Sequence, residues 1–528
     1  MSTYELHADV LVVGGGPAGT WAALKAAATG ASVVLADKGY CGTSGATAAA
    51  GTGVWYVQPE PELRAKAKAS REALGGYLAD HEWMDRVLDE TYARINELAE
   101  VGKYPFPASS DGTPIRRGVQ GPEYMRRQRA RVKRAGVRIL DHSPVLELLT
   151  DGTGAVAGAA GTDLTTGENY QVKAGAVVLA SGGCAFQSGT LGCNVNTGDG
   201  ALMAAEVGAV FSGMEFSNAY AIAPKFTSIT KTAYYSFGTF YRADGSVIEG
   251  AGSTRGRSVI ARTLLTEPVF CVIDKADAQM QADMRTGQPN FFLAFDRQGI
   301  NPFVDPFPVT MLLEGTVRGT GGVRVAGEDL STDVPGLYVA GDVATRELIC
   351  GGFTGGGSHN SAWAISSGSW AGAGAARYAL SVGARAASRV VRPAGQAGLR
   401  PLGRGGDITA DEARREVQNQ VIPYETNLFR TQDRLEPALV SVNLAWRRVV
   451  SGLAGDTYRS REAAAMVAHA RWMFNAALTR TETRGMHKRA DFPEQDPRQA
   501  HRLIAGGLDE LWSMPEAQFL RSQSAVSA

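Results

Sequence analysis

The chain has 528 residues, of which 44% are hydrophobic and 20% charged, so it is long enough for roughly two to four domains with cores of their own. Its 53 lysines and arginines balance its 53 aspartates and glutamates. This balance excludes a general electrostatic attraction to nucleic acid or to anionic membranes, and it leaves RNA modification without the basic surface that it requires.

The start of the chain lacks the basic residues and apolar core of a signal peptide, and no stretch approaches about 18 uninterrupted apolar residues. We therefore expect a cytoplasmic protein without a transmembrane segment. The five cysteines include no C-x-x-C pair, which argues against a disulfide framework, a structural zinc and an iron–sulfur cluster held by the chain itself. We expect no metal site.

Residues 9–37 have the pattern of a strand, a glycine turn, a helix and a second strand. The apolar run 9–13 predicts a buried strand, and the turn after it matches G-x-G-x-x-G. Such a turn approaches a pyrophosphate closely, the helix N-terminus stabilises its charge, and an acidic residue about 20 positions later binds a ribose hydroxyl. The residues expected to bind a dinucleotide here are Gly14, Gly16, Pro17, Ala18, Gly19, Asp37 and Lys38.

A lone glycine turn can simply join a strand to a helix, but later segments repeat the signs of a close backbone approach to a ligand. Residues 42–53 are too small to fill a core, 174–183 predict a buried strand that ends in glycines, and 336–342 predict another that ends in an acid. The further residues expected to bind the cofactor are Thr43, Ser44, Gly45, Ala180, Ser181, Gly182, Asp199, Gly341, Asp342, Asn360 and Ser361.

Together with residues 214–216 and the late motif at 482–493, these segments resemble the fumarate reductase and succinate dehydrogenase flavoprotein-subunit family, which includes L-aspartate oxidase and the adenylylsulfate reductase alpha subunit. The resemblance covers most of the chain and implies FAD, with Asp37 at the adenosine ribose and Asp342 near the ribityl chain. Some members carry a histidine that holds FAD covalently, at the segment that matches 44–47. No histidine lies there in this chain, so we expect FAD to be bound non-covalently.

The resemblance implies an α/β protein with a Rossmann-type FAD-binding domain, an inserted α+β capping domain and a C-terminal helical domain. The residues agree with this division: an aromatic stretch replaces nucleotide-type turns after residue 220, and helix formers dominate after 409. We predict an FAD-binding domain over 1–220 plus 322–395, a capping domain over 221–321 and a helical domain over 407–528.

The substrate ligands of the dicarboxylate-reducing members are missing. Their histidine before a glycine pair is absent from 316–322, their arginine before an Asn-Ser pair is absent from 355–361, and their T-E-G-x-R-G-E-G element is replaced by the aromatic run that ends at 241–245. A carboxylate needs charge-assisted partners to be held for hydride transfer. The chain therefore resembles a divergent member of this family, and we do not expect it to act on succinate or fumarate.

Four residues are candidates for catalysis, and each has a structural alternative. His359 could exchange a proton at the flavin or only hydrogen-bond its loop. Arg318 could bind an anionic substrate or form a salt bridge. Arg242 and Tyr241 could line the pocket from the capping domain or belong to its solvated surface and its core.

The function that the resemblance implies is hydride transfer between FAD N5 and a small anionic substrate, with electrons exchanged with an iron–sulfur, ferredoxin-like partner in a homo- or hetero-oligomer. One alternative is an oxygen-using oxidase or dehydrogenase of a small amine or hydroxy acid. Another is a flavin-bound scaffold without catalysis.

Overall fold

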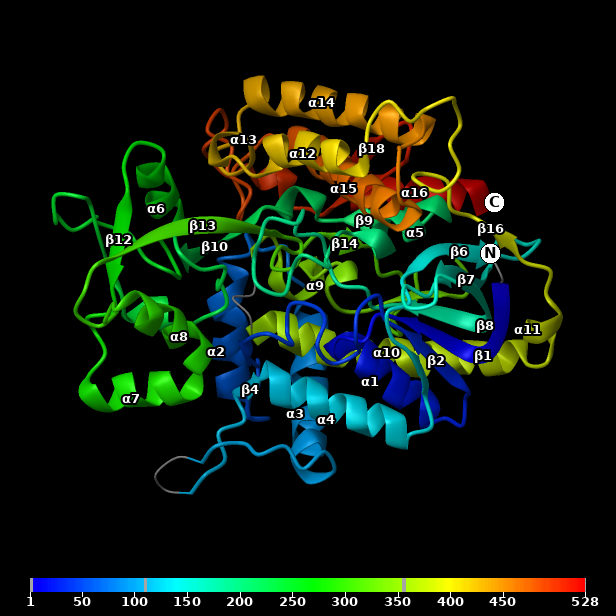
Figure 1. Ribbon diagram of the computed structural model, residues 1–528, viewed down its shortest axis with the longest axis horizontal. Coiled ribbons are helices and arrows are strands. Elements are labelled where there is room, and N and C mark those ends of the chain that lie inside the picture. The colour runs from blue at the N-terminus through cyan, green and yellow to red at the C-terminus, as the bar shows by residue number, and fades with distance from the viewer. Residues whose placement is uncertain (1–2, 109–111, 354–357, 528) are drawn as a thin grey trace.

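The computed structural model describes residues 3–108, 112–353 and 358–527. Figure 1 shows a large sheet with its helices at the lower right, a layer of helices above it and a smaller sheet with helices at the left. The α/β fold class predicted from the sequence is confirmed.

The large sheet is built around two long neighbouring strands, β1 and β8, which run parallel to each other. β2 and β5 extend the parallel pairing on one side, and β15 pairs in parallel with β8. The strands β7, β6 and β16 continue the other side in antiparallel fashion. The strands of this sheet are β1 (Thr3–Val13), β2 (Val33–Ala36), β5 (Arg138–Leu140), β6 (Val145–Thr150), β7 (Val156–Thr162), β8 (Asn169–Leu179), β15 (Leu337–Val339) and β16 (Arg392–Pro393).

Helices α1 and α10 pack on each other and on the large sheet, and α3 and α4 pack on these two helices. The closeness of α1 to α10 depends on two glycines of α10. A Cβ atom at Gly368 or Gly372 would lie 2.3 Å or 2.1 Å from a backbone oxygen of α1, which explains why α10 is rich in glycine, alanine and serine. These helices are α1 (Pro17–Ala27), α3 (His81–Glu100), α4 (Gly121–Arg134) and α10 (Ser358–Val382).

Residues 219–315 form a part that we call the cap, at the left of Figure 1. Its four antiparallel strands run in the order β10-β13-β12-β11. Its core is aromatic, because Tyr235 packs against Phe291 and Phe307, and Phe295 packs against both phenylalanines. The elements are β10 (Ala219–Pro224), η2 (Tyr234–Phe237), β11 (Thr239–Tyr241), α6 (Arg257–Leu264), β12 (Val269–Val272), α7 (Ala278–Gly287), α8 (Pro289–Gln298) and β13 (Phe307–Gly315).

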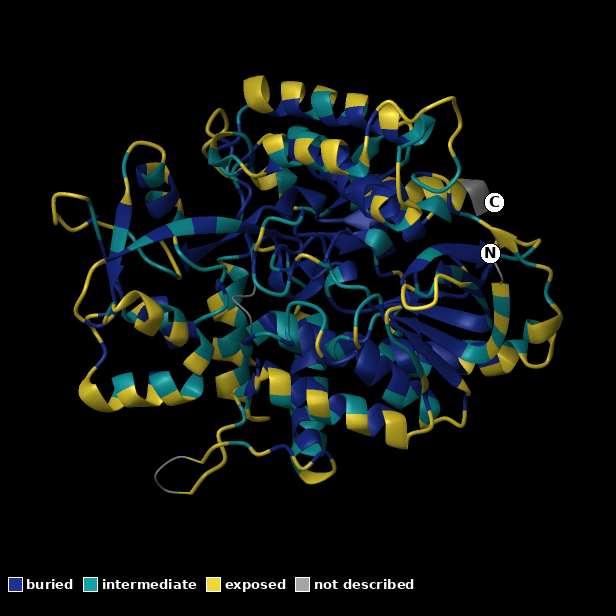
Figure 2. Ribbon diagram, viewed as in Figure 1, coloured by how far each residue is buried: buried dark blue, intermediate teal, exposed yellow. Residues whose placement is uncertain are grey.

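The C-terminal part forms the upper layer in Figure 1. Its central helix α15 is buried along most of its length (Figure 2), with α12 and α14 packed on it. This part also holds strands that the sequence did not predict, since β17 and β18 join β9 and β14 in a small sheet. The elements are β9 (Phe211–Ser212), β14 (Gly322–Val323), α12 (Ala410–Val421), α13 (Tyr424–Asn427), α14 (Gln432–Ser451), α15 (Thr457–Thr479), β17 (Leu503–Gly506), β18 (Trp512–Pro515) and α16 (Glu516–Ser527).

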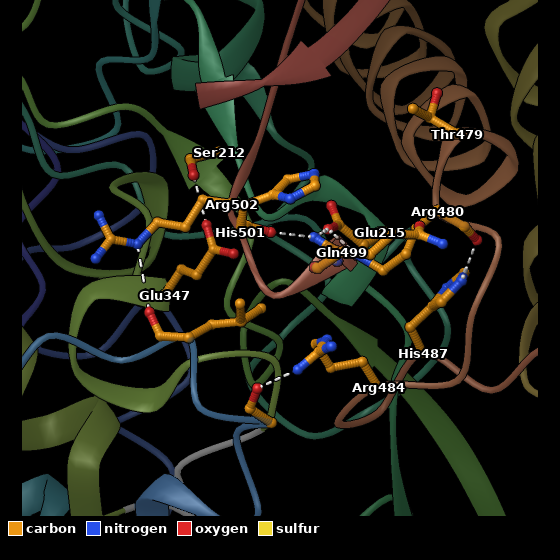
Figure 3. A network of polar contacts seen from close by, with 12 residues as sticks. Ser212, Glu215, Glu347, Thr479, Arg480, Arg484, His487, Gln499, His501 and Arg502 are labelled. Atoms are coloured by element: carbon orange, nitrogen blue, oxygen red, sulfur yellow. Dashed lines mark hydrogen bonds and ion pairs between the residues drawn. The ribbon is translucent and has the colours of Figure 1, made fainter. Parts of the chain in front are cut away.

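A buried polar network joins the C-terminal part to the large-sheet part (Figure 3). Arg480 donates to Glu215 at 2.8 Å and to Glu482 at 2.9 Å, and Arg484 donates to both oxygens of Glu482. Burial and the nearby arginines Arg430 and Arg480 hold the pKa of His487 well below its usual range. The late motif therefore serves as a structural joint between the two parts.

The remaining elements are short or peripheral: β3 (Gly51–Gly53), α2 (Pro61–Glu72), β4 (Gly118–Gln120), α5 (Asp199–Glu206), η1 (Met214–Phe216), η3 (Gly341–Val343), α9 (Glu347–Cys350), α11 (Arg385–Ser388) and η4 (Pro497–Gln499). None of the helices in the described ranges combines the length and the apolar character needed to cross a bilayer. The cytoplasmic location stays a prediction.

Candidate functional site

A cavity of about 730 Å³ lies where the carboxyl ends of the parallel strands β1, β2, β8 and β15 meet the cap. Ligands of open α/β sheets bind at this edge, and the volume lies within the usual range for cofactor sites. One end of the cavity is lined by the glycine turn 13–18, and the other by cap residues 231–234 and 286–288. The cavity therefore extends from the first strand–helix turn to the cap.

The glycine turn has the shape that its sequence predicted. At Gly14, φ is +106° and a Cβ atom would lie 2.3 Å from the carbonyl oxygen of Ala180. A Cβ at Gly19 would lie 1.7 Å from the carbonyl oxygen of Gly14, so this glycine is needed for packing and does not line the cavity. At Gly16, by contrast, a Cβ would meet no protein atom within 4 Å. The backbone at Gly16 is therefore open to a ligand at the N-terminus of α1.

Asp37 is buried at the end of β2 and is held by the turn it faces. Its carboxylate accepts hydrogen bonds from the backbone N–H of Gly15 at 2.6 Å and from Ser44 Oγ at 2.7 Å. The neighbouring Lys38 has a different role, since its Nζ contacts Asp199 at 2.7 Å and Glu462 of α15 at 2.8 Å. Burial opposes the charge on Lys38, but the two carboxylates outweigh it and raise the pKa of the ammonium. Lys38 thus links the cavity wall to the C-terminal part.

The structure brings nearly all of the predicted cofactor residues to the cavity. The exceptions are Gly19 and the exposed Thr43. The predicted residues that line it are Gly14, Gly16, Pro17, Ala18, Asp37, Lys38, Ser44, Gly45, Ala180, Ser181, Gly182, Asp199, Gly341, Asp342, Asn360 and Ser361.

Unpartnered polar atoms in the wall test whether a flavin dinucleotide fits. Ser181 Oγ, Asn196 Oδ1 and Asn360 Oδ1 are buried without a hydrogen-bond partner among the described residues, and all three residues line the cavity. Buried polar atoms left without partners are costly, so these atoms mark places for donors and acceptors of a ligand. The hydroxyls and imide of FAD provide such groups, and the donor set fits this cofactor.

A cluster of charged side chains lies at the cap-side end of the cavity. Glu314, fully buried on β13, contacts Arg318 Nη1 at 3.1 Å and Lys231 Nζ at 3.3 Å, and accepts a hydrogen bond from Thr230 Oγ1 at 2.7 Å. Burial opposes ionisation of Glu314, but Arg318 and Lys231 outweigh it and hold its pKa at about 2. Burial, followed by repulsion from Arg318, lowers the pKa of Arg257 to about 10. Two cations therefore contact the Glu314 carboxylate, and a third lies close enough to respond to its charge.

Arg318 and Lys231 both line the cavity but differ in the donors they have left. Lys231 Nζ contacts the carbonyl oxygen of Leu191 and the sulfur of Cys193, each at 3.1 Å, in addition to Glu314. Its three N–H groups are thus used. Arg318 Nε has no partner in the described part of the chain. Of these two cations, Arg318 is the one that retains a donor for a ligand.

His359 lies behind the cavity wall. Its ring is buried and packs on Trp55 with 4.1 Å between ring centroids, and its Nδ1 lies 3.1 Å from Ser358 Oγ. Its neighbours Asn360 and Ser361 line the cavity, whereas His359 does not. The imidazole therefore supports the start of α10, and its placement does not favour contact with a substrate.

The two cap candidates from the sequence lie away from the cavity. Tyr241 Oη hydrogen-bonds Asp274 at 2.9 Å, and Arg242, with 41% of its side chain exposed, pairs with Glu267. Neither lines the cavity. The aromatic run reaches the site through Tyr234 of η2 instead, while Tyr241 lies on the edge strand β11.

Sequence reasoning missed Lys231, Asn196, Glu314 and Gln288. Glu314 carried a signal, because a carboxylate four residues before Arg318 at the end of an apolar strand has to be paired when buried. The other three come from loops, whose side-chain directions are set by contacts distant in sequence. Among the described residues, no three or more histidine, cysteine or acidic side chains gather in a group able to hold a metal ion.

Comparison with known proteins supports the assignment of this cavity as a flavin site. The family of the FAD binding domain matches residues 9–224, and that of the fumarate reductase flavoprotein C-terminus matches 415–507. The chain is 26% identical over 563 residues to the fumarate reductase flavoprotein subunit of Mycobacterium tuberculosis, covering 94% of each chain. It is 28% identical over 540 residues to L-aspartate oxidase of the same species, covering 95% of this chain and 96% of the oxidase.

Solved structures show the same fold. Escherichia coli quinol fumarate reductase FrdA superposes with a TM-score of 0.81 at 20% identity, covering 98% of this chain and 97% of that one. Adenylylsulfate reductase from Archaeoglobus fulgidus superposes with a TM-score of 0.75 at 18% identity, covering 97% and 96%. The matching families and the relatives that align along nearly the whole chain both indicate an FAD-dependent enzyme, and the cavity is consistent with it. This evidence argues against a non-catalytic scaffold. The chain therefore belongs to the fumarate reductase and succinate dehydrogenase flavoprotein family and is an FAD-dependent oxidoreductase.

Proposed function

We propose that the protein oxidises or reduces a small anionic substrate, other than succinate or fumarate, at the cap-side end of the cavity. Arg318 carries this proposal, because its guanidinium lines the cavity and its Nε lacks a partner among the described residues. When bound, FAD supplies hydride chemistry at its N5 atom. The chain's own residues bind and orient the substrate, and the cap excludes water.

The charges at this end of the cavity argue against a dicarboxylate. Two carboxylates need two sets of charge-assisted donors. Arg318 offers one set, while the Lys231 ammonium is already used by Leu191, Cys193 and Glu314. The arginine that other members carry before the Asn-Ser pair is absent from the sequence at 355–361, of which 355–357 lie outside the described residues.

Anaerobic mixing tests the proposal directly. FAD-loaded protein is mixed with hydroxy acids, amino acids and other small anions, and loss of the oxidised flavin band is followed; the reverse reaction is followed from the reduced protein. We expect reaction with a non-dicarboxylate anion, and a rate lowered about tenfold to a hundredfold by Arg318→Gln, as expected for a lost charge-assisted hydrogen bond. Reaction with succinate or fumarate alone would contradict the proposal.

We further infer that electrons are exchanged with an iron–sulfur, ferredoxin-like partner. The full-length relatives that are named as subunits support this inference, since these relatives are parts of assemblies. The resemblance to L-aspartate oxidase favours oxygen as the alternative acceptor, in an oxidase of a small amine or hydroxy acid. Photoreduction followed by air separates the two: slow reoxidation supports a protein partner, and reoxidation within seconds supports an oxidase.

A further inference from the structure

The lining of the cavity also includes a group of apolar and aromatic side chains, which we call the apolar wall. Its residues come from β4, from the segment before it and from the cap: Tyr104, Pro105, Pro107, Ile115, Val119 and Tyr234. Tyr234 Oη donates to the carbonyl oxygen of Met284 at 2.9 Å, and Tyr104 Oη accepts a hydrogen bond from the backbone N–H of Gln120 at 2.7 Å. The Tyr234 hydroxyl thus donates to the backbone and the Tyr104 hydroxyl accepts from it, while both rings offer apolar contact surface.

Burial also raises the pKa of the Tyr234 phenol to about 12, so the ring stays neutral at physiological pH. An uncharged aromatic ring with an engaged hydroxyl offers apolar area and few polar contacts. None of these six side chains carries a charge, so the wall offers no ionic partner to a charged end of a substrate. An apolar body, by contrast, gains by leaving water when it packs there.

Contacts between the cap and the large-sheet part enclose this wall. The Gln120 side chain donates to the carbonyl oxygen of Gly287 at the end of α7, and Asn290 Nδ2 donates to the carbonyl oxygen of Ala49 at 3.2 Å. Gln288 Nε2 donates to the carbonyl oxygen of Lys231 at 2.9 Å. The apolar wall is therefore assembled from both parts, and a bound body of matching shape is covered from both sides.

The charged cluster provides for one anion. Lys231 and Arg318 contact the carboxylate of Glu314, and Arg257 is close enough to respond to its charge. The other nearby carboxylate, Asp342, is paired with Arg346, so the cluster keeps an excess of positive charge. A buried excess charge is costly until an anion compensates it. Of the two cations of this cluster that line the cavity, Arg318 is the one with a donor that lacks a partner among the described residues, so we expect a single anionic group to bind there.

We propose that the substrate is a monoanion with an apolar body, an aryl or branched-chain carboxylate, whose carboxylate binds Arg318 and whose body packs on Tyr234 and Tyr104. This inference rests on the proposed function and names the substrate class of the same site. It predicts that the affinity of the protein for a monoanion rises with the apolar area of that anion, which an anion site alone would not predict.

Equilibrium binding to the oxidised, FAD-loaded protein tests the inference without turnover. Phenylacetate, isovalerate, acetate, succinate and the neutral phenylacetamide are titrated, with the flavin absorption band and calorimetry as readouts. We expect phenylacetate and isovalerate to bind about tenfold or more tightly than acetate and succinate, because each added apolar group that is buried contributes affinity. Phenylacetamide is expected to bind about tenfold to a hundredfold more weakly than phenylacetate, because it lacks the charge.

Variants assign the two contacts. Arg318→Gln is expected to remove the preference for phenylacetate over phenylacetamide, whereas Arg126→Gln, at an exposed ion pair on α4, is the matched control and leaves it unchanged. Tyr234→Ala is expected to weaken the binding of phenylacetate and to leave the binding of acetate unchanged. Tyr234→Phe is expected to leave the affinity for both anions unchanged. Ile115→Ser, at a position with 44% exposure, tests the same wall if Tyr234→Ala does not fold.

Equal affinity for succinate and phenylacetate, equal affinity for phenylacetamide and phenylacetate, or no binding by either apolar anion would each overturn the inference. Failure of the proposed function has a different signature. In that case the apolar monoanions bind with the expected preference, but no anion exchanges electrons with the flavin in the anaerobic mixing experiment.

Discussion

Glu314 sets the charge balance of the site at the scale of single residues. It is fully buried and lies between Arg318 and Lys231, with Arg257 close enough to respond to its charge. Because its pKa is held at about 2, it is ionised throughout the physiological range. The carboxylate both orients Arg318 and offsets the buried cations.

Removing the Glu314 charge is expected to destabilise the fold strongly. In Glu314→Gln the three cations lose their counter-charge, and breaking a buried ion pair in this way costs about 3–5 kcal/mol. Urea unfolding of the apo and FAD-loaded forms measures the loss. Glu328→Gln, at a side chain with 84% exposure, is the control and should change the free energy of unfolding by less than about 0.5 kcal/mol. An equal effect of the two changes would contradict the role given to Glu314.

Gly14 and Gly16 form a matched pair that separates folding from cofactor binding. Gly14→Ala forces a side chain into a positive φ and against Ala180, so we expect a loss of about 1–3 kcal/mol or more in folding stability. Gly16 has φ of −73° and no protein atom near its Cβ direction, so Gly16→Ala should fold normally but bind FAD more weakly. Unfolding curves and FAD titration distinguish the two. Normal FAD affinity in Gly16→Ala would show that the cofactor does not approach this backbone.

At the scale of elements, the joint between the C-terminal part and the large-sheet part depends on buried charge (Figure 3). Glu347 of α9 lies in this joint, fully buried, and hydrogen-bonds Ser212 Oγ of β9. Burial, followed by repulsion from Glu215, raises the pKa of Glu347 to about 8. Its neutral form is therefore favoured by the folded state.

This shift predicts a pH dependence of stability with a definite sign. Because the folded pKa of about 8 lies above the usual 4.5, the contribution of Glu347 is complete below pH 4.5 and is lost as the pH rises towards 8. Glu347→Gln, which stays neutral, should remove this loss. Urea midpoints at pH about 5 and about 8.5 measure it, and we expect the variant to gain stability relative to the wild type at the higher pH. Parallel pH profiles of the two proteins would exclude Glu347 as the titrating group.

At the scale of the whole molecule, the cavity depends on segments from the entire chain. The glycine turn, the segment 44–53, the ends of β8 and β15, the start of α10 and two loops of the cap all line it. Glu462 of α15 adds a contact from the C-terminal part through Lys38. No single part of the chain forms the site, so FAD binding and cap closure are expected to stabilise the molecule as a unit.

Release of the cofactor by acid is a prediction for the whole protein. The segment 44–47 holds no histidine, and none of the described residues that line the cavity is a histidine. Acid precipitation should therefore leave the protein colourless and the FAD in solution, as read from the visible spectrum of each fraction. Flavin retained on the precipitate would contradict non-covalent binding.

The cofactor site could be predicted from the sequence because its residues are dictated by backbone geometry. Gly14, Asp37 and Asp342 lie at strand ends or in the turns that follow them. Their positions in the sequence are therefore enough to place them at the cavity. The absence of the dicarboxylate ligands could also be recognised from the sequence, because these residues have fixed places relative to short motifs. The α/β fold followed from apolar strands that end in glycines.

The substrate side was decided by tertiary structure. The folding of the cap decides whether Tyr241 or Tyr234 reaches the cavity. Likewise, the Lys231 ammonium has no unused N–H group because it contacts Leu191, Cys193 and Glu314. Local sequence determines backbone conformation, since sterics and hydrogen bonding act over a few residues. The direction and pairing of a loop side chain are set by partners distant in sequence, which only the folded molecule brings together.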